Sequence, residues 1–169
     1  PMETWRVHDA FDDPLPGTSA ADDLGLIGGT FGTGAPSLQT YDVKTAGATT
    51  LRARATLALP PEYVATQDVV LRLRAGMLTT VADTSCTLDV EAYKSNGDAT
   101  KTGSDLYSGS SNSINSLTFA NFDYTIDAST LSPGDVLDVR VSIAVNDGAS
   151  GTAVYGCIGA ASLLCDIRG

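Results

Sequence analysis

Apolar and polar residues alternate along most of the chain from residue 49 onward. In residues 51–59, for example, Leu51, Ala53 and Ala55 alternate with Arg52 and Arg54. A period of two is typical of a half-buried β-strand, because successive side chains point to opposite faces. The same pattern returns in further segments, at 69–75, 86–92, 117–119 with 122–126, 139–145 and 153–167. No window keeps an apolar period of 3.6 residues, so we expect an all-β chain with at most a helical turn near residues 62–65.

Turn residues separate these segments and indicate how the strands are arranged. Pro60-Pro61, Pro133-Gly134 and Asn146-Asp147-Gly148 each follow or precede a predicted strand, and residues 95–116 form a polar loop. Seven or eight strands with such turns predict an antiparallel β-sandwich, and the mixture of long strands and long loops favours a jelly-roll-like version. We assign residues 49–169 to this sandwich, with a bulge near Gly156 or Gly159 in the last strand.

Residues 1–48 follow a different pattern, which predicts an extended, acidic, glycine-rich N-terminal arm. Five glycines fall between residues 25 and 34, a density that opposes both helix and regular strand. Apolar side chains are nevertheless frequent in the arm. We expect them to be covered by another subunit, and we predict a partner or subunit interface made of Trp5, Val7, Phe11, Leu26, Ile27 and Phe31.

The charge of the chain excludes two classes of partner. Twenty acidic residues face ten basic ones, giving a net charge of −10. A protein that tracks a nucleic-acid backbone or an anionic membrane needs a basic surface, so neither partner is expected. We find no apolar stretch long enough to span a membrane and no basic, apolar signal sequence near residue 1. We therefore expect a product made in the cytoplasm.

The three cysteines, Cys86, Cys157 and Cys165, form no CxxC pair. Cys86 and Cys165 occupy apolar strand positions, where a free thiol behaves as a small hydrophobic group. We expect buried structural thiols and a reducing compartment.

Candidate catalytic groups are few. His8 is the only histidine, and it lies in the predicted arm rather than beside a nucleophile. One histidine without a CxxC pair also leaves too few ligands for a zinc site of the usual type. The glycine-rich run 28–34 lacks the lysine and the helix of a phosphate-binding loop. We predict no catalytic residue, no bound metal and no cofactor.

Two kinds of ligand stay open at this level. The loops 9–13 and 146–148 offer oxygen ligands for calcium, although neither matches a twelve-residue calcium loop. Aromatic side chains could line a shallow carbohydrate site; they are Tyr93, Tyr107, Phe122 and Tyr124.

Five segments resemble predicted structural proteins encoded by tailed bacteriophages. They are LPPEYV (59–64), LRLRAGM (71–77), VADTSCTLDVEAY (81–93), LSPGDVLDVRV (131–141) and LLCDIR (163–168). The resemblance lies mostly in strands and turns and carries no site residues. It implies a non-enzymatic virion component, most plausibly a capsid decoration or cement protein, often trimeric, that binds the major capsid protein on the outer capsid surface after synthesis in the host cytoplasm.

Two other functions compete with this interpretation. One is a receptor- or glycan-binding module of a phage tail or fibre, acting through Tyr93 or Tyr107. The other is a glycoside-active enzyme that uses Asp89 and Glu91. Because Asp89 and Glu91 share one strand face, they are better explained as a solvated surface than as two carboxyls across a cleft.

Overall fold

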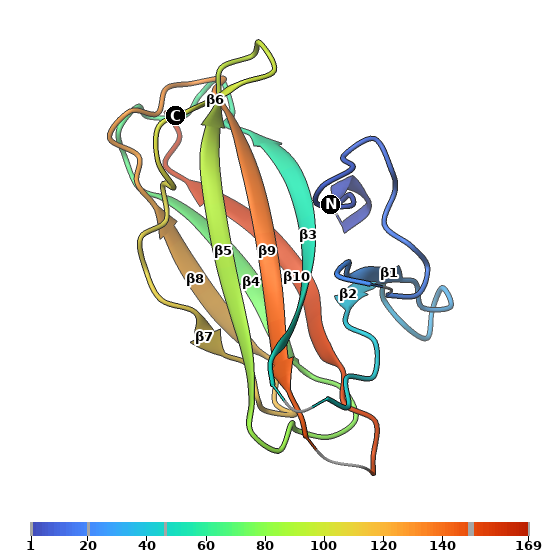
Figure 1. Cartoon of the computed structure of the whole chain (residues 1–169). Helices are drawn as coiled ribbons and strands as arrows, with labels where there is room; N and C mark the ends of the chain where they lie inside the picture. Colours follow the sequence, from blue (N-terminus) through green and yellow to red (C-terminus); the bar gives the residue numbers. More distant parts are fainter. Residues whose placement is uncertain (1, 20, 46, 149–150, 169) are drawn as a thin grey trace.

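The computed structural model describes residues 2–19, 21–45, 47–148 and 151–168, which form two antiparallel sheets (Figure 1). Sheet A contains, in spatial order, β3 (Thr49–Ala58), β9 (Val136–Asn146), β5 (Ser85–Ser95) and β6 (Lys101–Thr102), with β7 (Asn112–Ser113) also paired to β5. Sheet B contains β1 (Gly25–Ile27), β2 (Ser37–Gln39), β10 (Gly156–Cys165), β4 (Val69–Met77) and β8 (Ala120–Ile126). The only helical element in the described residues is a short 3-10 turn, η1 (Met2–Thr4).

The long strands alternate between the two sheets along the chain. From β2 to β5 each strand lies in the sheet opposite to the one before it, and β8, β9 and β10 repeat this alternation. The resulting orders, β2-β10-β4-β8 and β3-β9-β5, are those of a jelly roll. The predicted all-β, jelly-roll-like sandwich is therefore confirmed. Within the described residues, no helix is long and apolar enough to cross a membrane.

The inward positions of the long strands form the core. Alternation is regular in β9, where Val139, Val141 and Ile143 are buried while Arg140 and Ser142 are partly exposed. The inward residues of β3, β4 and β5 meet them from both sheets, as the period of two predicts. The pairing of β10 with β4 shifts register between Ile158 and Ala160, which places the predicted bulge at Gly159.

The N-terminal segment is part of the sandwich, which corrects our expectation of an arm that waits for a partner. Figure 1 shows it lying along β3, the edge strand of sheet A. The amide of Leu24 donates to the carbonyl of Arg52 at 2.8 Å, and Arg6 pairs with Arg54. β1 and β2 then extend sheet B beyond β10. The segment thus covers the edge where the two sheets would otherwise stay open.

Trp5 is the main anchor of this closure. It is only 2% exposed, although we expected it at a subunit interface. Trp5 borders a small cavity of about 120 Å³ together with Leu57 of β3, Leu71 of β4 and Leu163 of β10. These residues come from both sheets, so the indole lies between the edges of the two sheets. The glycine content of this segment predicted an arm that needs a partner, but the long edge strand β3 supplies backbone partners for an irregular segment.

Candidate functional site

Charged side chains gather on the outer face of sheet A because the strand register brings them together. Arg140 of β9 lies directly between two partners, Arg54 of β3 and Glu91 of β5. Asp138, two residues earlier on the same face, pairs with Tyr93 of β5. Cross-strand neighbours on one face lie close enough for their side chains to interact. The outward polar positions of three strands therefore converge on one patch.

Two arginine–carboxylate pairs organise this patch. Arg54 donates from Nε and Nη2 to the two carboxylate oxygens of Asp138, each at 2.6 Å. Arg140 donates from Nε to Oε2 of Glu91 at 2.7 Å, and its Nη2 bonds to the same oxygen. The hydrogen bond to Asp138 raises the pKa of Arg54. These pairs let two neighbouring arginines share one sheet face without repelling each other.

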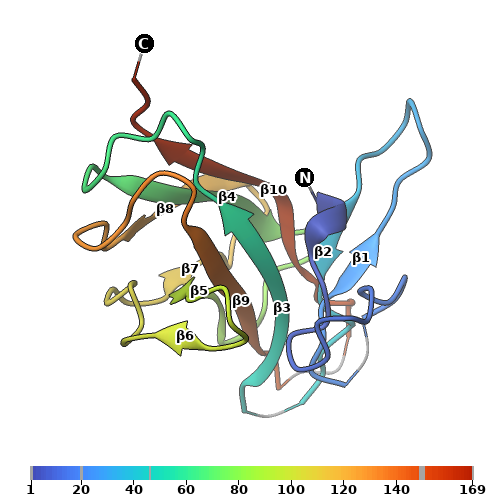
Figure 2. The ribbon, with the colours of Figure 1, turned by 90° about the horizontal axis from the view of Figure 1, so that it is seen from above.

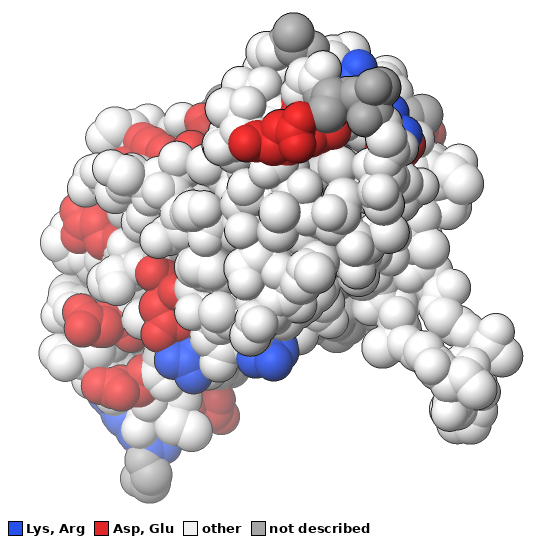
Figure 3. All heavy atoms as spheres, turned by 90° about the horizontal axis from the view of Figure 1, so that it is seen from below, with Lys and Arg blue, Asp and Glu red and all other residues white. Residues whose placement is uncertain are grey.

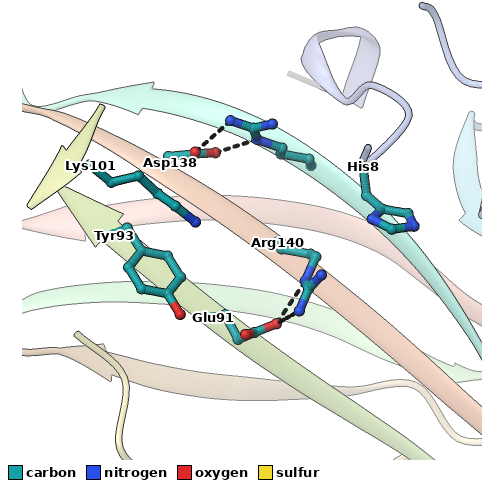
Figure 4. A pocket seen from close by; sticks show the side chains of 7 residues that line it. His8, Glu91, Tyr93, Lys101, Asp138 and Arg140 are labelled. Carbon is teal, nitrogen blue, oxygen red and sulfur yellow. Dashed lines mark hydrogen bonds and ion pairs between the residues drawn. The ribbon is translucent and has the colours of Figure 1, made fainter. Parts of the chain in front are cut away.

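A cavity of about 270 Å³ lies over these pairs (Figure 4). Seven residues line it, namely His8, Arg54, Glu91, Tyr93, Lys101, Asp138 and Arg140. Lys101 reaches in from β6, and its Nζ lies 3.9 Å from the centroid of the Tyr93 ring. Burial, followed by the nearby carboxylates Asp105 and Glu91, raises the pKa of Tyr93. The cavity therefore offers one aromatic ring among charged hydrogen-bonding groups.

The N-terminal segment supplies one wall of this cavity. His8 lines the cavity and its Nε2 lies 2.9 Å from Oδ2 of Asp22. Phe11 packs beneath the Arg54 guanidinium, whose carbon lies 5.0 Å from the ring centroid. The N-terminal segment that covers the edge of β3 therefore also completes the site on sheet A.

One group of side chains has the composition of a cation site. His8, Asp22 and Asp23 each place a ligand atom within 4.8 Å of the others. Oδ1 of Asp23 is buried and accepts no hydrogen bond from a described residue. Burial, reinforced by Asp22, raises the pKa of Asp23. Nitrogen and carboxylate oxygen together suit a divalent metal, but the His8–Asp22 hydrogen bond already accounts for the position of these two groups.

The loops that we considered for calcium have other contacts. Oδ1 of Asp147 accepts a hydrogen bond from the amide of Asp83 at 2.8 Å, which ties two loops together. Asp9 and Asp12 are exposed in the N-terminal segment.

The hairpin tip between β1 and β2, residues 28–36, is the second notable feature. Figure 2 shows it projecting from the body of the sandwich, and the same projection in Figure 3 carries no charged residue. Phe31 at its end is 101% exposed. The amides of Thr33 and Gly34 both donate to the carbonyl of Thr30, which fixes the turn. At Gly29 an added Cβ would lie 2.4 Å from the backbone of Gly34, so this hairpin requires glycine to close.

The six residues predicted at an interface fall into three environments. Trp5 is buried, while Val7 and Leu26 are partly buried and pack against the core. Phe11 and Ile27 are also partly exposed, Phe11 being covered by Arg54. Only Phe31 projects fully into solvent. An interface role for these residues stays a prediction, and Phe31 is the side chain placed to fulfil it without rearrangement.

Of the aromatic residues considered for carbohydrate binding, only Tyr93 lines the cavity on sheet A. Tyr124 is buried, and its hydroxyl donates to the carbonyl of Leu88 at 3.0 Å. Tyr107 packs edge-on against Tyr124, with ring centroids 5.2 Å apart. Phe122 is partly buried against the core. Sequence reasoning missed Lys101, because it lies in a segment that we treated as a polar loop.

Comparisons with known proteins bear on the fold. No protein-family model matches the chain, and no curated protein matches its sequence. The chain is similar to the enzymatically active domain of bacteriophage CBA120 tailspike protein 4, with a TM-score of 0.50 and 10% identity over 98% of this chain and 20% of that one. It therefore spans about a fifth of the tailspike domain.

Two further likenesses are weaker. A family 16 carbohydrate-binding module gives a TM-score of 0.41 and 15% identity, covering 79% of each chain. The CBM22-1 xylan-binding domain from Paenibacillus barcinonensis gives a TM-score of 0.45 and 10% identity, over 87% of this chain and 83% of that one. At 10% identity, the likeness to the tailspike domain indicates a shared fold alone.

Proposed function

We propose that this chain is a non-enzymatic structural protein of a virus particle, and that it binds the outer capsid surface across capsomer joints as a decoration or cement protein. Its partners are the major capsid protein and further copies of itself, as a homotrimer. The observation that supports this proposal is the uncharged hairpin tip, residues 28–36, which carries Phe31 away from an acidic body.

The hairpin has the properties of an attachment element. Residues 24–41 contain no charged side chain in a chain with a net charge of −10. The base of the hairpin is fixed, because β1 pairs with β2 and the amide of Leu26 donates to the carbonyl of Pro16 at 2.9 Å. An uncharged, anchored tip can approach another protein surface without desolvating a charge. Such an element suits recognition of a preformed pocket or joint.

The energetics explain why several copies would act together. Burying one phenylalanine side chain contributes about 1.5–3 kcal/mol, which alone gives weak binding. A trimer that presents three such tips to a symmetric joint gains affinity through effective concentration without new contacts. The acidic surface of the body keeps free copies soluble and apart until they meet the shell.

A sedimentation assay tests this proposal. Shells of the encoding virus that lack the protein are mixed with the wild-type chain or with the Phe31→Ser variant. Wild-type protein is expected to saturate the shells. Phe31→Ser is expected to weaken binding by more than tenfold, since roughly 1.4 kcal/mol corresponds to a factor of ten, one phenylalanine contributes about 1.5–3 kcal/mol, and a trimer loses three of them. Leu117→Ser is the matched control, because Leu117 is 56% exposed outside the hairpin. Failure of the wild type to bind, or equal losses in both variants, contradicts the proposal.

A second candidate function rests on a different observation. The cavity of about 270 Å³ on sheet A combines Tyr93 with two arginine–carboxylate pairs and Lys101. Oriented hydrogen-bonding groups around an aromatic ring are typical of sites that hold a sugar. The chain would then be a glycan-binding module of a phage tail or fibre. Glycan binding that survives Phe31→Ser but is lost on substitution of Tyr93 distinguishes this function from shell attachment.

A further inference from the structure

The cavity on sheet A contains an excess of positive charge. Three cations, Arg54, Lys101 and Arg140, face two carboxylates, Glu91 and Asp138. The chain as a whole carries a net charge of −10, so the local charge of this patch has the opposite sign to the net charge. Both carboxylates are already bound by arginines. The remaining charge therefore belongs to Lys101.

Lys101 differs from the two other lysines of the chain. Lys44 lies 3.0 Å from Oδ2 of Asp42, and Lys94 lies 2.6 Å from Oδ2 of Asp135. Lys101 forms no ion pair with a carboxylate of the described residues, and its ammonium instead lies over the Tyr93 ring. An ammonium group has three donors, and a ring face satisfies none of them as a carboxylate would. Its donors are thus available inside the cavity.

The two arginines that line the cavity also keep unused donors. Arg54 and Arg140 each use Nε and Nη2 for their carboxylates, and no described residue accepts a hydrogen bond from Nη1 of either. Figure 4 shows Lys101, Tyr93 and Arg140 around one central space. The site therefore offers spare donors and one unbalanced positive charge beside an aromatic ring.

We propose that this cavity binds a sugar that bears a single negative charge, with the anionic group on Lys101 and the sugar ring beside Tyr93. This inference rests on the second candidate function, glycan binding. A singly charged carboxylate or sulfate ester balances the one excess cation. A phosphate dianion or a polyanion would overfill the site and meet the carboxylates Glu91 and Asp138. A neutral sugar would leave the positive charge of Lys101 unbalanced.

A glycan array with paired ligands tests the proposal. Uronic-acid, sialic-acid and sulfated oligosaccharides are printed beside the neutral oligosaccharide of the same backbone, so the source of the charge is identified. The wild type is expected to bind acidic members and to lose affinity as salt increases. Lys101→Gln is expected to weaken this binding roughly tenfold, as for the loss of one charged hydrogen bond. Lys101→Arg should retain most of it.

Lys44→Gln is the control, because it removes the same charge from a lysine outside the cavity. Unchanged binding by Lys44→Gln together with loss in Lys101→Gln supports the site. Equal binding of neutral and acidic members overturns the inference while leaving glycan binding intact. Equal losses in both lysine variants overturn it as well, since a general charge effect would then be sufficient. Binding to no member of the array overturns both the inference and the second candidate function.

Discussion

The backbones of Arg6 and Arg54 pair in both directions. The amide of Arg6 donates to the carbonyl of Arg54 at 2.8 Å, and the amide of Arg54 donates back to the carbonyl of Arg6 at 3.0 Å. This exchange places a residue of the irregular N-terminal segment beside the edge of sheet A. The segment is therefore a structural part of the jelly roll, and two of its aromatic side chains lie in opposite environments: Trp5 is buried in the core, and Phe31 lies in solvent, where our proposal assigns it to contact with a partner.

Replacing these two aromatic residues should affect stability unequally. Trp5→Ala removes a side chain that is 2% exposed, and we expect it to lower the free energy of unfolding by about 3–5 kcal/mol. Phe31→Ala removes a side chain in full contact with water, and we expect a change within about 0.5 kcal/mol. Urea denaturation measures both free-energy changes. It is followed by far-UV circular dichroism, because Trp5→Ala removes the single tryptophan and with it the fluorescence signal. Small, similar effects would show that the N-terminal segment does not dock as described.

The Arg54–Asp138 pair should contribute more to stability than a geometrically similar pair on sheet B. Arg72 also binds Asp123 through Nε and Nη2, both at 2.7 Å, but these side chains are 41% and 44% exposed. In the Arg54 pair the side chains are 33% and 11% exposed. We expect a coupling of about 1.5–3 kcal/mol for Arg54–Asp138 and a clearly smaller coupling for the solvent-exposed pair Arg72–Asp123. Double-mutant cycles measure the two couplings, and equal values would contradict the role of burial.

Neighbouring aspartates should respond to pH with opposite signs. The hydrogen bond with His8 lowers the pKa of Asp22. The ionised form of Asp22 therefore stabilises the fold above the ordinary carboxyl pKa of about 3.9. This contribution is lost as the pH falls through the lowered pKa of Asp22. Burial raises the pKa of Asp23, so ionisation destabilises the fold above that raised pKa. At pH 7 we therefore expect Asp22→Asn to lose stability and Asp23→Asn to gain it.

Both differences should disappear in acid. The gain of Asp23→Asn should vanish as pH falls from the raised pKa to about 3.9, and the loss of Asp22→Asn should vanish at still lower pH. We check the signs of the two stability differences by denaturing the wild type and both variants at pH 7. The same measurement is repeated about one pH unit below the ordinary carboxyl pKa. A loss of stability for Asp23→Asn at pH 7 would contradict the conclusion that burial dominates the pKa of this carboxyl group.

The three free cysteines should differ in reactivity. Burial raises the pKa of Cys86 to about 12, and it also raises the pKa of Cys157, which is equally enclosed. Cys165 is only half-buried, although burial followed by Asp166 raises its pKa too. Because the thiolate is the reacting form, we expect native protein to be alkylated at Cys165 first. Peptide mass spectrometry after brief alkylation tests this order, with urea-unfolded protein as the control for full labelling.

The fold could be predicted from the sequence where the signal was local. Alternation in 51–59, 69–75, 86–92 and 139–145 located β3, β4, β5 and β9, since each pattern needs only neighbouring residues. The packing of residues 2–19 and 21–45 could not be predicted in this way. The order of the N-terminal segment depends on backbone pairing with β3. No pattern within the segment predicts which distant strand it pairs with.

The candidate site was partly visible for the same reason. Arg54, Glu91 and Arg140 occupy outward positions of predicted strands, so their exposure followed from the period of two. Their meeting required the strand order β3-β9-β5, which alternation does not specify. Lys101 gave no signal at all. It reaches Tyr93 because a two-residue strand, β6, pairs with the end of β5.

Electron cryomicroscopy of particles of the encoding virus tests the proposed function most directly. We predict density for this jelly roll on the outside of the shell, grouped as trimers at capsomer joints, with residues 28–36 in contact with the major capsid protein. Absence of the chain from the shell, or attachment through a surface that leaves Phe31 in solvent, would contradict the account.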